Sequence, residues 1–212
     1  MSEFTSGHIL RAEDRDIVRK YAVEGSVIMQ LNEQFIAYLT SDVYNQLPVP
    51  EHIQQLSQEA PVLYFYNFED HEWGYRLIYR ETETAKLHIA YEYEEEIISK
   101  TAMGRYPEKS FRELLFGGTL QKIREELEAG SLFEEKLEEL FDDSRPEEFQ
   151  LLGASGTQIE KLREILNINF INHDINEGME LSDEFKQALG IEEMSFIRHE
   201  HIVESKRYDE IF

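Results

Sequence analysis

The glycine-rich turn at residues 153–157, Gly-Ala-Ser-Gly-Thr, is the first stretch whose residue types could do chemistry. If a strand precedes this turn and a helix follows it, free N–H groups at the helix N-terminus can hold a phosphate. The spacing meets part of the dinucleotide fingerprint, but Ile159 takes the place of the third glycine. Thr157 and Glu160 also have the spacing of a capping box, which explains the turn as an ordinary helix start. The nucleotide-binding alternative has four candidate anion-binding residues, Gly153, Ser155, Gly156 and Thr157.

The second stretch is a His-x-His pair in residues 194–204, which we expect to form a strand. Side chains two positions apart in a strand point to the same face, so His199 and His201 have the spacing of two ligands of one metal ion. A third ligand must come from elsewhere, and His173 and Asp174 are the candidate donors. A metal-dependent enzyme built on these residues is the second functional hypothesis. The alternative is a pair of half-exposed strand histidines that bond to their neighbours.

Positions 123–150 hold a dense run of acidic residues, with eleven Asp and Glu side chains against three Lys and Arg. Within this run, Glu134 and Glu138 are like charges one helical turn apart, and so are Glu135 and Glu139. Each such pair costs roughly 0.2–0.5 kcal/mol of helix stability. A negative helix face that persists at this cost suits a basic protein partner, while a solvated face without a partner is the alternative.

Aromatic residues are concentrated between positions 62 and 93, in segments that alternate like strands. Tyrosine and tryptophan are favoured at binding surfaces because they combine a large apolar area with a polar group. Four of them are candidate partner-binding residues, namely Tyr64, Tyr66, Trp73 and Tyr75. Ordinary packing within the core and the sheet is the alternative explanation.

The net charge of the whole chain, −23, repels nucleic acid and anionic membranes, so neither is an expected partner. The absence of cysteine removes disulfides, thiolate metal ligands and thiol nucleophiles. The first residues lack the basic and apolar regions of a signal peptide, and no apolar run reaches the roughly 18 residues of a transmembrane helix. We therefore expect a soluble, cytoplasmic protein, with enough hydrophobic residues, 41%, to build a core.

Hydrophobic patterning predicts an α+β fold whose N-terminal part is an antiparallel sheet. Residues 12–22 read as a helix, segments 26–31 and 34–40 as a hairpin, and a further helix begins near Pro50. Three aromatic-rich strands follow at 62–68, 73–80 and 85–93, and the middle one alternates between a buried face and a face in water. The resulting order, α-ββ-α-βββ, is similar to that of PAS-like and profilin-like sensor or scaffold domains.

The pattern becomes helical from 94 to 145, with capping boxes at Ser110–Glu113 and Ser131–Glu134. Beyond a candidate linker at 142–148, the tail predicts strands at 149–152, 167–172 and 194–204 and helices at 157–166 and 182–189. The chain accordingly divides into an antiparallel sheet with helices (1–93), an acidic helical segment (94–145) and a small α/β C-terminal unit (146–212). These parts can pack as one domain.

No set of residues in the sequence forms a convincing catalytic site. The leading hypothesis is therefore a non-catalytic binding or regulatory protein that contacts a protein partner through the acidic helical face or the aromatic sheet. It requires no cofactor. The sequence leaves the identity of the partner, the pathway and the oligomeric state open.

Overall fold

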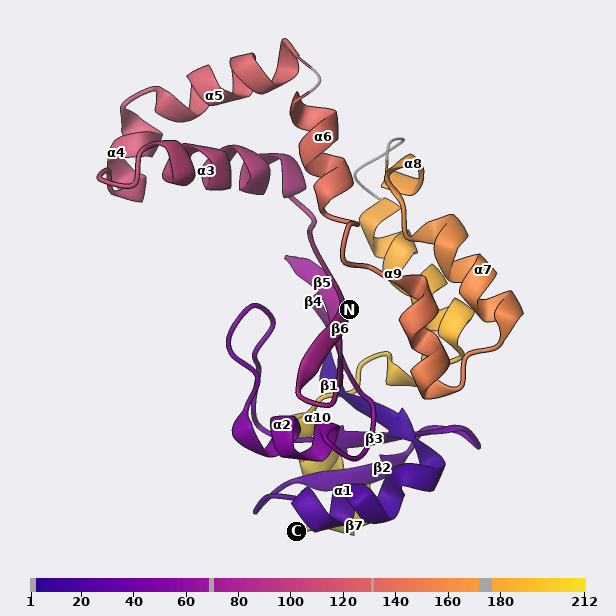
Figure 1. Ribbon diagram of the computed structural model, residues 1–212. Helices are drawn as coiled ribbons and strands as arrows, with labels where there is room; N and C mark the ends of the chain where they lie inside the picture. The colour runs from indigo at the N-terminus through magenta and orange to yellow at the C-terminus, as the bar shows by residue number, and fades with distance from the viewer. Residues whose placement is uncertain (1–2, 69–70, 131, 172–176) are drawn as a thin grey trace.

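A seven-stranded sheet forms the centre of the α+β fold seen in the computed structural model, which describes residues 3–68, 71–130, 132–171 and 177–212 (Figure 1). The strand order is β6-β5-β4-β1-β3-β2-β7, and every pairing among the described residues is antiparallel. The strands are β1 (Phe4–Arg11), β2 (Val27–Gln30), β3 (Phe35–Leu39), β4 (Val62–Phe68), β5 (Glu72–Tyr79), β6 (Thr82–Ala90) and β7 (Glu210–Ile211). The predicted α+β class and its N-terminal antiparallel sheet are confirmed.

Strand β1 lies in the middle of this sheet, between β4 and β3, although the sequence pattern did not indicate it. The element order is therefore β-α-ββ-α-βββ rather than the predicted α-ββ-α-βββ. The sequence of this strand does not alternate between apolar and polar residues, because the polar residues Thr5 and His8 are buried there and bond to neighbouring groups. Gly7 also lies inside the strand. Glycine is required there because a Cβ at this position would lie 2.4 Å from the side chain of Leu39. A central strand with these residues has no apolar alternation to detect.

The predicted hairpin of β2 and β3 forms, and both this turn and the one between β5 and β6 have a local cause. Between β2 and β3, the Asn32 side-chain oxygen accepts the N–H groups of Gln34 and Phe35, both at 3.0 Å, as an Asx turn does. Between β5 and β6, the turn residues Arg80 and Glu81 have φ angles of 53° and 61°. Two successive positive φ angles give the turn the twist that suits a two-residue hairpin.

Helices α1 (Arg15–Tyr21) and α2 (Glu51–Ser57) cover one face of the sheet. They bury an apolar cluster made by Leu10, Val18, Ile28, Ile36, Tyr38, Ile53, Leu56, Ala60, Val62 and Ile78. The prediction that β5 turns a wet face to solvent is wrong, because Ile78 is buried in this cluster. Arg76 on the same face is half-buried, and its guanidinium donates to the carbonyl oxygens of Tyr44 and Leu47 in the loop that precedes α2.

The C-terminal part of the chain covers the opposite face as helices, and not as the α/β unit with strands that the sequence predicted. Segment 149–152 belongs to a 3₁₀ helix (Pro146–Leu152), and the predicted strand at 167–172 contains the short helix α8 (Ile168–Ile171). The predicted helices are α7 (Gly156–Ile165) and α9 (Glu177–Leu189), and a 3₁₀ turn (Glu192–Met194) and α10 (His199–Ser205) replace the strand at 194–204. The apolar tail residues Phe149, Leu162 and Phe185 pack with Phe65 and Trp73 in the main core.

The prediction of strands in these three segments is wrong because a few apolar residues in a short stretch fit either period. A local feature favours the helical form in each case. Pro146 stands at the start of the first 3₁₀ helix, where a missing N–H costs nothing. Before α8, the Asn167 side-chain oxygen accepts the N–H of Asn169 at 2.9 Å. At α10, Ile202 is fully buried while His201 and Glu204 on either side are exposed, as on a one-sided helix.

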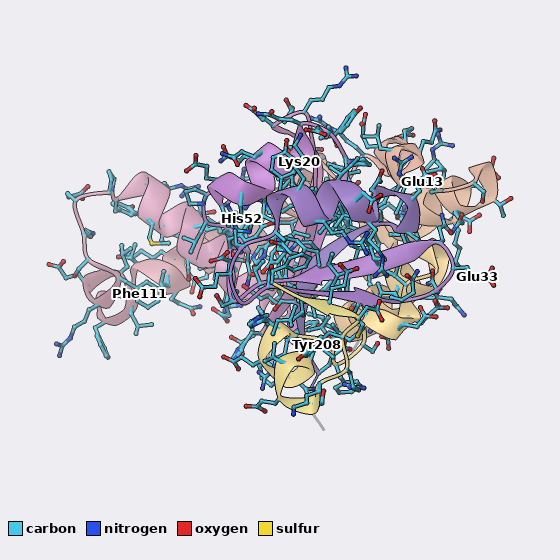
Figure 2. All side chains as sticks on the ribbon, turned by 90° about the horizontal axis from the view of Figure 1, so that it is seen from below. Glu13, Lys20, Glu33, His52, Phe111 and Tyr208 are labelled. Atoms are coloured by element: carbon cyan, nitrogen blue, oxygen red, sulfur yellow. The ribbon has the colours of Figure 1, made fainter. Side chains whose placement is uncertain are left out.

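Four helices between β6 and the first C-terminal 3₁₀ helix form an arm that projects away from the sheet (Figure 1). They are α3 (Tyr93–Arg105), α4 (Phe111–Phe116), α5 (Thr119–Glu128) and α6 (Leu132–Glu139). The arm has an apolar cluster of its own, made by Ile97, Ile98, Ala102, Leu114, Ile123, Leu127 and Leu137. Figure 2 shows Phe111 at the outer end of this arm. Among the described residues, no helix is long and apolar enough to cross a bilayer.

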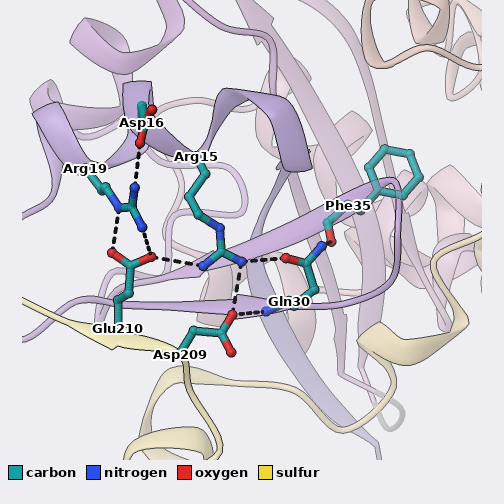
Figure 3. A network of polar contacts seen from close by, with 7 residues as sticks. All are labelled: Arg15, Asp16, Arg19, Gln30, Phe35, Asp209 and Glu210. Carbon is teal, nitrogen blue, oxygen red and sulfur yellow. Dashed lines mark hydrogen bonds and ion pairs between the residues drawn. The ribbon is translucent and has the colours of Figure 1, made fainter.

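Strand β7 joins the edge of the sheet beside β2, where charged side chains hold it (Figure 3). Arg15 and Arg19, both on α1, contact the Glu210 carboxylate at 2.9 and 2.7 Å. The Asp209 carboxylate accepts from Arg15 at 3.0 Å and from the backbone N–H of Gln30 at 2.8 Å. The hydrogen bond from Arg19, with the second bond from Arg15, lowers the pKa of Glu210 to about 2. Residues nearly 200 positions apart thus close one edge of the sheet.

Candidate functional site

The helical arm carries a groove of about 520 Å³ near its base, where α3, α5 and α6 meet. Its lining comes from Glu94, Arg124, Leu127, Glu128, Gly130, Phe133 and Glu134. Leu127 is almost fully buried and Phe133 is half-buried, so they give the groove an apolar floor. The three glutamates are exposed on its rim. We call this feature the arm groove.

Arg124 is the cation among the groove residues, and it contacts several carboxylates. Its guanidinium lies 3.9 Å from the carboxylate of Glu94 and 4.0 Å from that of Glu128, and it also bonds to Glu95. One arginine therefore faces three acidic side chains, while Glu134 adds a further negative charge to the rim. The rim keeps an excess of negative charge above an apolar floor.

The predicted acidic face of α6 is adjacent to this groove. Glu134, Glu135, Glu138 and Glu139 are all exposed, and Glu134 lines the groove itself. Lys136 contacts the Glu139 carboxylate at 2.5 Å, so this acid is compensated locally. The fold places Glu94 and Glu128 beside Glu134, although the three residues come from three helices and Glu94 is far from the other two in the sequence.

The local sequence explains how the arm helices begin. Ser110 starts α4 with a complete capping box: its side chain accepts the N–H of Glu113, whose carboxylate accepts the N–H of Ser110 at 2.9 Å. The predicted box at Ser110–Glu113 is confirmed, whereas Ser131 lies outside the described residues. Helix α5 places Ile123 and Leu127 on one buried stripe, as an amphipathic helix does.

A second cavity, of about 330 Å³, lies where the sheet meets the base of the arm. Its lining residues are Asn45, Gln46, Tyr66, Arg76, Glu83, Lys86, Leu87, His88, Lys100, Glu139, Leu140 and Asp143. Tyr66 Oη and His88 Nδ1 share a hydrogen bond of 2.8 Å, and His88 Nε2 lies 3.5 Å from the Glu96 carboxylate. Glu96 in turn accepts from Lys100 at 2.6 Å. A chain of titratable groups thus runs from the sheet to α3.

The charges of this cavity balance one another. Arg76, Lys86 and Lys100 stand against Glu83, Glu139 and Asp143, and each cation contacts a carboxylate in or beside the cavity. The hydrogen bonds from His88 and Lys100 lower the pKa of Glu96 to about 2. Burial raises the pKa of the Tyr66 phenol, so its hydroxyl keeps its proton and serves as a hydrogen-bonding group rather than a nucleophile. A charged ligand would have to displace existing ion pairs here.

No family model matches the chain, and neither a curated protein nor a solved structure does. The structural features of the site are therefore the basis for any functional proposal.

The four candidate aromatic residues do not form an open surface. Tyr64, Tyr66, Trp73 and Tyr75 are all fully buried. Trp73 and Tyr75 belong to the main core, where Tyr75 stacks on Phe185 with ring centres 4.8 Å apart. Tyr64 and Tyr66 lie on the other face, under the loop that precedes α2. The core-packing alternative explains Trp73 and Tyr75, whereas Tyr66 lines the second cavity.

The two histidines of the His-x-His pair do not share a face, because they lie on helix α10 and not on a strand. Residues two apart on a helix point in directions roughly 200° apart. His199 Nε2 lies 2.7 Å from the Gly25 carbonyl oxygen, whereas His201 Nδ1 lies 3.3 Å from that of Phe196. The other candidate ligands, His173 and Asp174, are outside the described residues. Within the described ranges, no group of three or more His, Cys, Asp or Glu side chains is placed to hold a metal ion.

The glycine-rich turn starts α7, but its capping box differs from the predicted one. Ser155, and not Thr157, is the cap: its side chain accepts the N–H of Gln158, whose side-chain oxygen accepts the N–H of Ser155 at 2.9 Å. Gly153 has a φ of 83° and ends the preceding 3₁₀ helix, while Gly156 is the first residue of α7. The strand that a dinucleotide loop requires is therefore absent from this segment. The four candidate anion-binding residues remain together, but as a helix–turn–helix junction.

Proposed function

We propose that this protein is a non-catalytic protein-binding module, and that its arm groove binds a basic partner segment that carries an apolar anchor. The observation that supports this proposal is the combination, in one groove, of the acidic rim formed by Glu94, Glu128 and Glu134 with the apolar floor formed by Leu127 and Phe133. An apolar anchor that fills a pocket supplies affinity, and charges on the rim steer the partner and select its sign.

The position of the groove supports the same conclusion. The arm that carries the groove projects away from the sheet (Figure 1). The exposed acids of α6 extend the negative surface beyond the groove. A protein partner is favoured over a nucleic acid because the net charge of −23 repels phosphate backbones. A regulatory role in the cytoplasm accords with the cysteine-free sequence.

Binding of a synthetic amphipathic helix of leucine and lysine tests this proposal. We expect the wild-type protein to bind it, and binding to weaken as salt is added, because the rim charges are exposed. The variant Glu94→Gln/Glu128→Gln/Glu134→Gln should bind about tenfold more weakly, since three rim charges each contribute about 0.5 kcal/mol. Fluorescence anisotropy of the labelled peptide measures both effects.

The matched control is Glu160→Gln/Glu164→Gln/Glu200→Gln, which removes three exposed acids from α7 and α10. Its net charge equals that of the groove variant, so a general electrostatic attraction would weaken equally in both. Equal affinities for the two variants would refute a specific role of the arm groove.

A further inference from the structure

The outer end of the arm exposes large apolar side chains. We call residues 103–122 the arm tip. Phe116 is 78% exposed and Phe111 is 52% exposed, and Met103 and Leu115 are also about half exposed. Phe111, Leu115 and Phe116 lie on α4, and Met103 lies near the end of α3. Figure 2 shows Phe111 at the end of the arm furthest from the sheet. An apolar patch that projects from the molecule indicates a contact surface.

The arm tip is also positively charged, in contrast to the rest of the chain. Residues 103–122 contain four basic residues (Arg105, Lys109, Arg112 and Lys122) against two acidic ones (Glu108 and Glu113), which gives +2. Within the described part of the chain, Arg105 pairs with Glu126. The other three cations of the tip form no ion pair with a described residue. Arg112 lies over the Phe116 ring, 6.0 Å from its centre, so a cation accompanies the most exposed apolar side chain.

The arm tip therefore has the chemistry that the arm groove requires of its partner: cations around an apolar anchor. Both features belong to the same arm and lie at its opposite ends. Glu94 is in the first turn of α3 and Arg105 is in its last turn. Because the helix rises 1.5 Å per residue, these two residues lie roughly 17 Å apart along α3. Two arms that lie side by side in antiparallel orientation place each tip against the groove of the other.

We propose that the arm groove receives the arm tip of a second copy of this chain, so that two arms pair in a two-fold symmetric dimer. This inference rests on the proposed function of the groove and names its partner. The same contact occurs twice, as an isologous interface requires. Phe111 and Phe116 fill the space above Leu127 and Phe133 of the other copy, while Lys109 and Arg112 face Glu128 and Glu134.

The net charge of each copy and the area that the interface buries are both compatible with this dimer. A net charge of −23 on each copy opposes self-association, but physiological salt screens charges beyond roughly 8 Å. Antiparallel arms keep the two bodies apart by about the length of α3, which exceeds two screening lengths. Burying a half-exposed side chain of this size removes on the order of 100 Å² from water. With four exposed apolar side chains in each tip, two tips bury roughly 800 Å². The arm surfaces that cover them bury a similar area, so the total is on the order of the roughly 1,600 Å² of a standard stable interface.

Sedimentation velocity over a range of concentrations tests the proposal on the full chain. The wild-type protein should be dimeric at high concentration. Phe111→Ser/Phe116→Ser should be monomeric, whereas Val43→Ser/Leu47→Ser, which alters two exposed apolar residues of the loop before α2, should remain dimeric. Circular dichroism establishes that each variant is folded. A monomeric wild-type protein, or a dimer that persists in the Phe variant, would overturn the inference.

Reversing the charges of the arm tip and of the arm groove in separate variants tests the pairing of these two surfaces directly. The tip variant Lys109→Glu/Arg112→Glu and the groove variant Glu128→Lys/Glu134→Lys should each be monomeric, because both contacts of either homodimer then oppose like charges. An equimolar mixture should dimerise, because each of its two contacts is again between opposite charges. Lys206→Glu/Arg207→Glu, which reverses two exposed cations near the C-terminus, is the control and should leave the dimer unchanged. Failure of the mixture to associate would exclude this pairing.

Three further outcomes show how this inference and the proposed function stand relative to each other. A monomeric wild-type protein that still binds the leucine–lysine helix through the rim glutamates would retain the function of the groove and remove the second copy as its partner. Cosedimentation of the wild-type protein with phosphatidylserine vesicles, lost in Phe111→Ser/Phe116→Ser, would assign the tip to an anionic lipid surface instead and overturn the dimer. Absence of both peptide binding and dimerisation would reject both proposals.

Discussion

The Tyr66 hydroxyl lies 2.8 Å from Nδ1 of His88, although the two residues are on strands that do not pair with each other. Gly74 on β5 stands between them, opposite Tyr66 on one side and His88 on the other. A Cβ at Gly74 would meet the Tyr66 hydroxyl at 2.5 Å and the Leu87 carbonyl oxygen at 2.3 Å. Only a residue without a side chain allows the tyrosine to reach across β5.

Gly74→Ala should therefore destabilise the protein by about 1–3 kcal/mol, the cost of an added methyl group in a filled site. The Leu87 carbonyl belongs to the backbone and cannot rotate away. Gly156→Ala is the matched control, because a Cβ there meets nothing within 4 Å and α7 favours alanine. Urea unfolding of the two variants measures the difference. A Gly74→Ala protein as stable as Gly156→Ala would contradict the close approach.

A second long-range contact joins the start of the chain to α9. The Lys186 ammonium is buried and lies 3.0 Å from the Glu3 carboxylate, 2.8 Å from that of Asp183 and 2.7 Å from the Ser195 hydroxyl. Lys186→Met should cost about 3–5 kcal/mol of unfolding free energy, because it leaves the Glu3 charge buried without this cation. Lys161→Met, which breaks an exposed ion pair with Glu184, should cost at most about 1 kcal/mol.

The double variant Lys186→Met/Glu3→Gln isolates the electrostatic part of this effect. A glutamine at position 3 keeps groups that can bond to Thr5 and Asn67 but carries no charge. We expect it to recover part of the stability that Lys186→Met loses. If the double variant is no more stable than the single one by chemical denaturation, the loss comes from packing and not from an uncompensated charge.

The sequence predicts the parts of this fold where the period of apolar residues is unambiguous. Strand β5 has large apolar residues at every second position from Trp73 to Tyr79, β6 alternates apolar and polar residues from Ala85 to Ile89, and α5 repeats apolar residues at helical spacing. The tail was mistaken because its segments are short and because the core they cover, made by Phe65 and Trp73, is far away in sequence. Strand β1 escaped detection because His8 and Thr5 are polar groups buried with bonding partners.

The sequence predicts that the candidate site is an acidic surface, but it does not predict which residues make up the arm groove. The acidic run correctly marked α6 as an exposed negative face, which includes Glu134. Glu94 and Glu128 join it because three helices converge, and no sequence spacing encodes that convergence. The positive, apolar character of the arm tip was hidden by the net charge of the whole chain, which averages over local patches.

The cap of α7 provides a test with two neighbouring residues. The Ser155 side chain accepts an N–H of the first turn, whereas Thr157 lies within the helix and is exposed. Ser155→Ala should lower the unfolding free energy by about 1 kcal/mol, since an N-cap bond is lost. Thr157→Ala should change it little or raise it slightly, because alanine is the better helix former. Thermal unfolding of both variants decides between the two capping boxes, and a larger loss for Thr157→Ala would favour the one predicted from the sequence.

The buried imidazole of His8 predicts how stability depends on pH. His8 Nδ1 lies 2.9 Å from the Tyr38 carbonyl oxygen and Nε2 lies 2.9 Å from the Tyr44 hydroxyl, so the neutral ring is bonded at both nitrogens. Burial lowers the pKa of His8 to about 3 in the folded protein, from 6.5 for an exposed histidine. Between these values the unfolded chain binds a proton that the folded chain does not. Stability is therefore fully present above pH 6.5 and falls as the pH decreases towards 3, with a slope of about 1.4 kcal/mol per pH unit from this group.

A set of unfolding curves between pH 7 and pH 4 measures this slope. His8→Gln should be less stable at pH 7 but should lose less stability on acidification, because the glutamine does not titrate. His201→Gln is the control: it removes an exposed histidine and should keep the wild-type slope. A slope for His8→Gln equal to that of the wild type would show that the acid sensitivity of the protein has another origin.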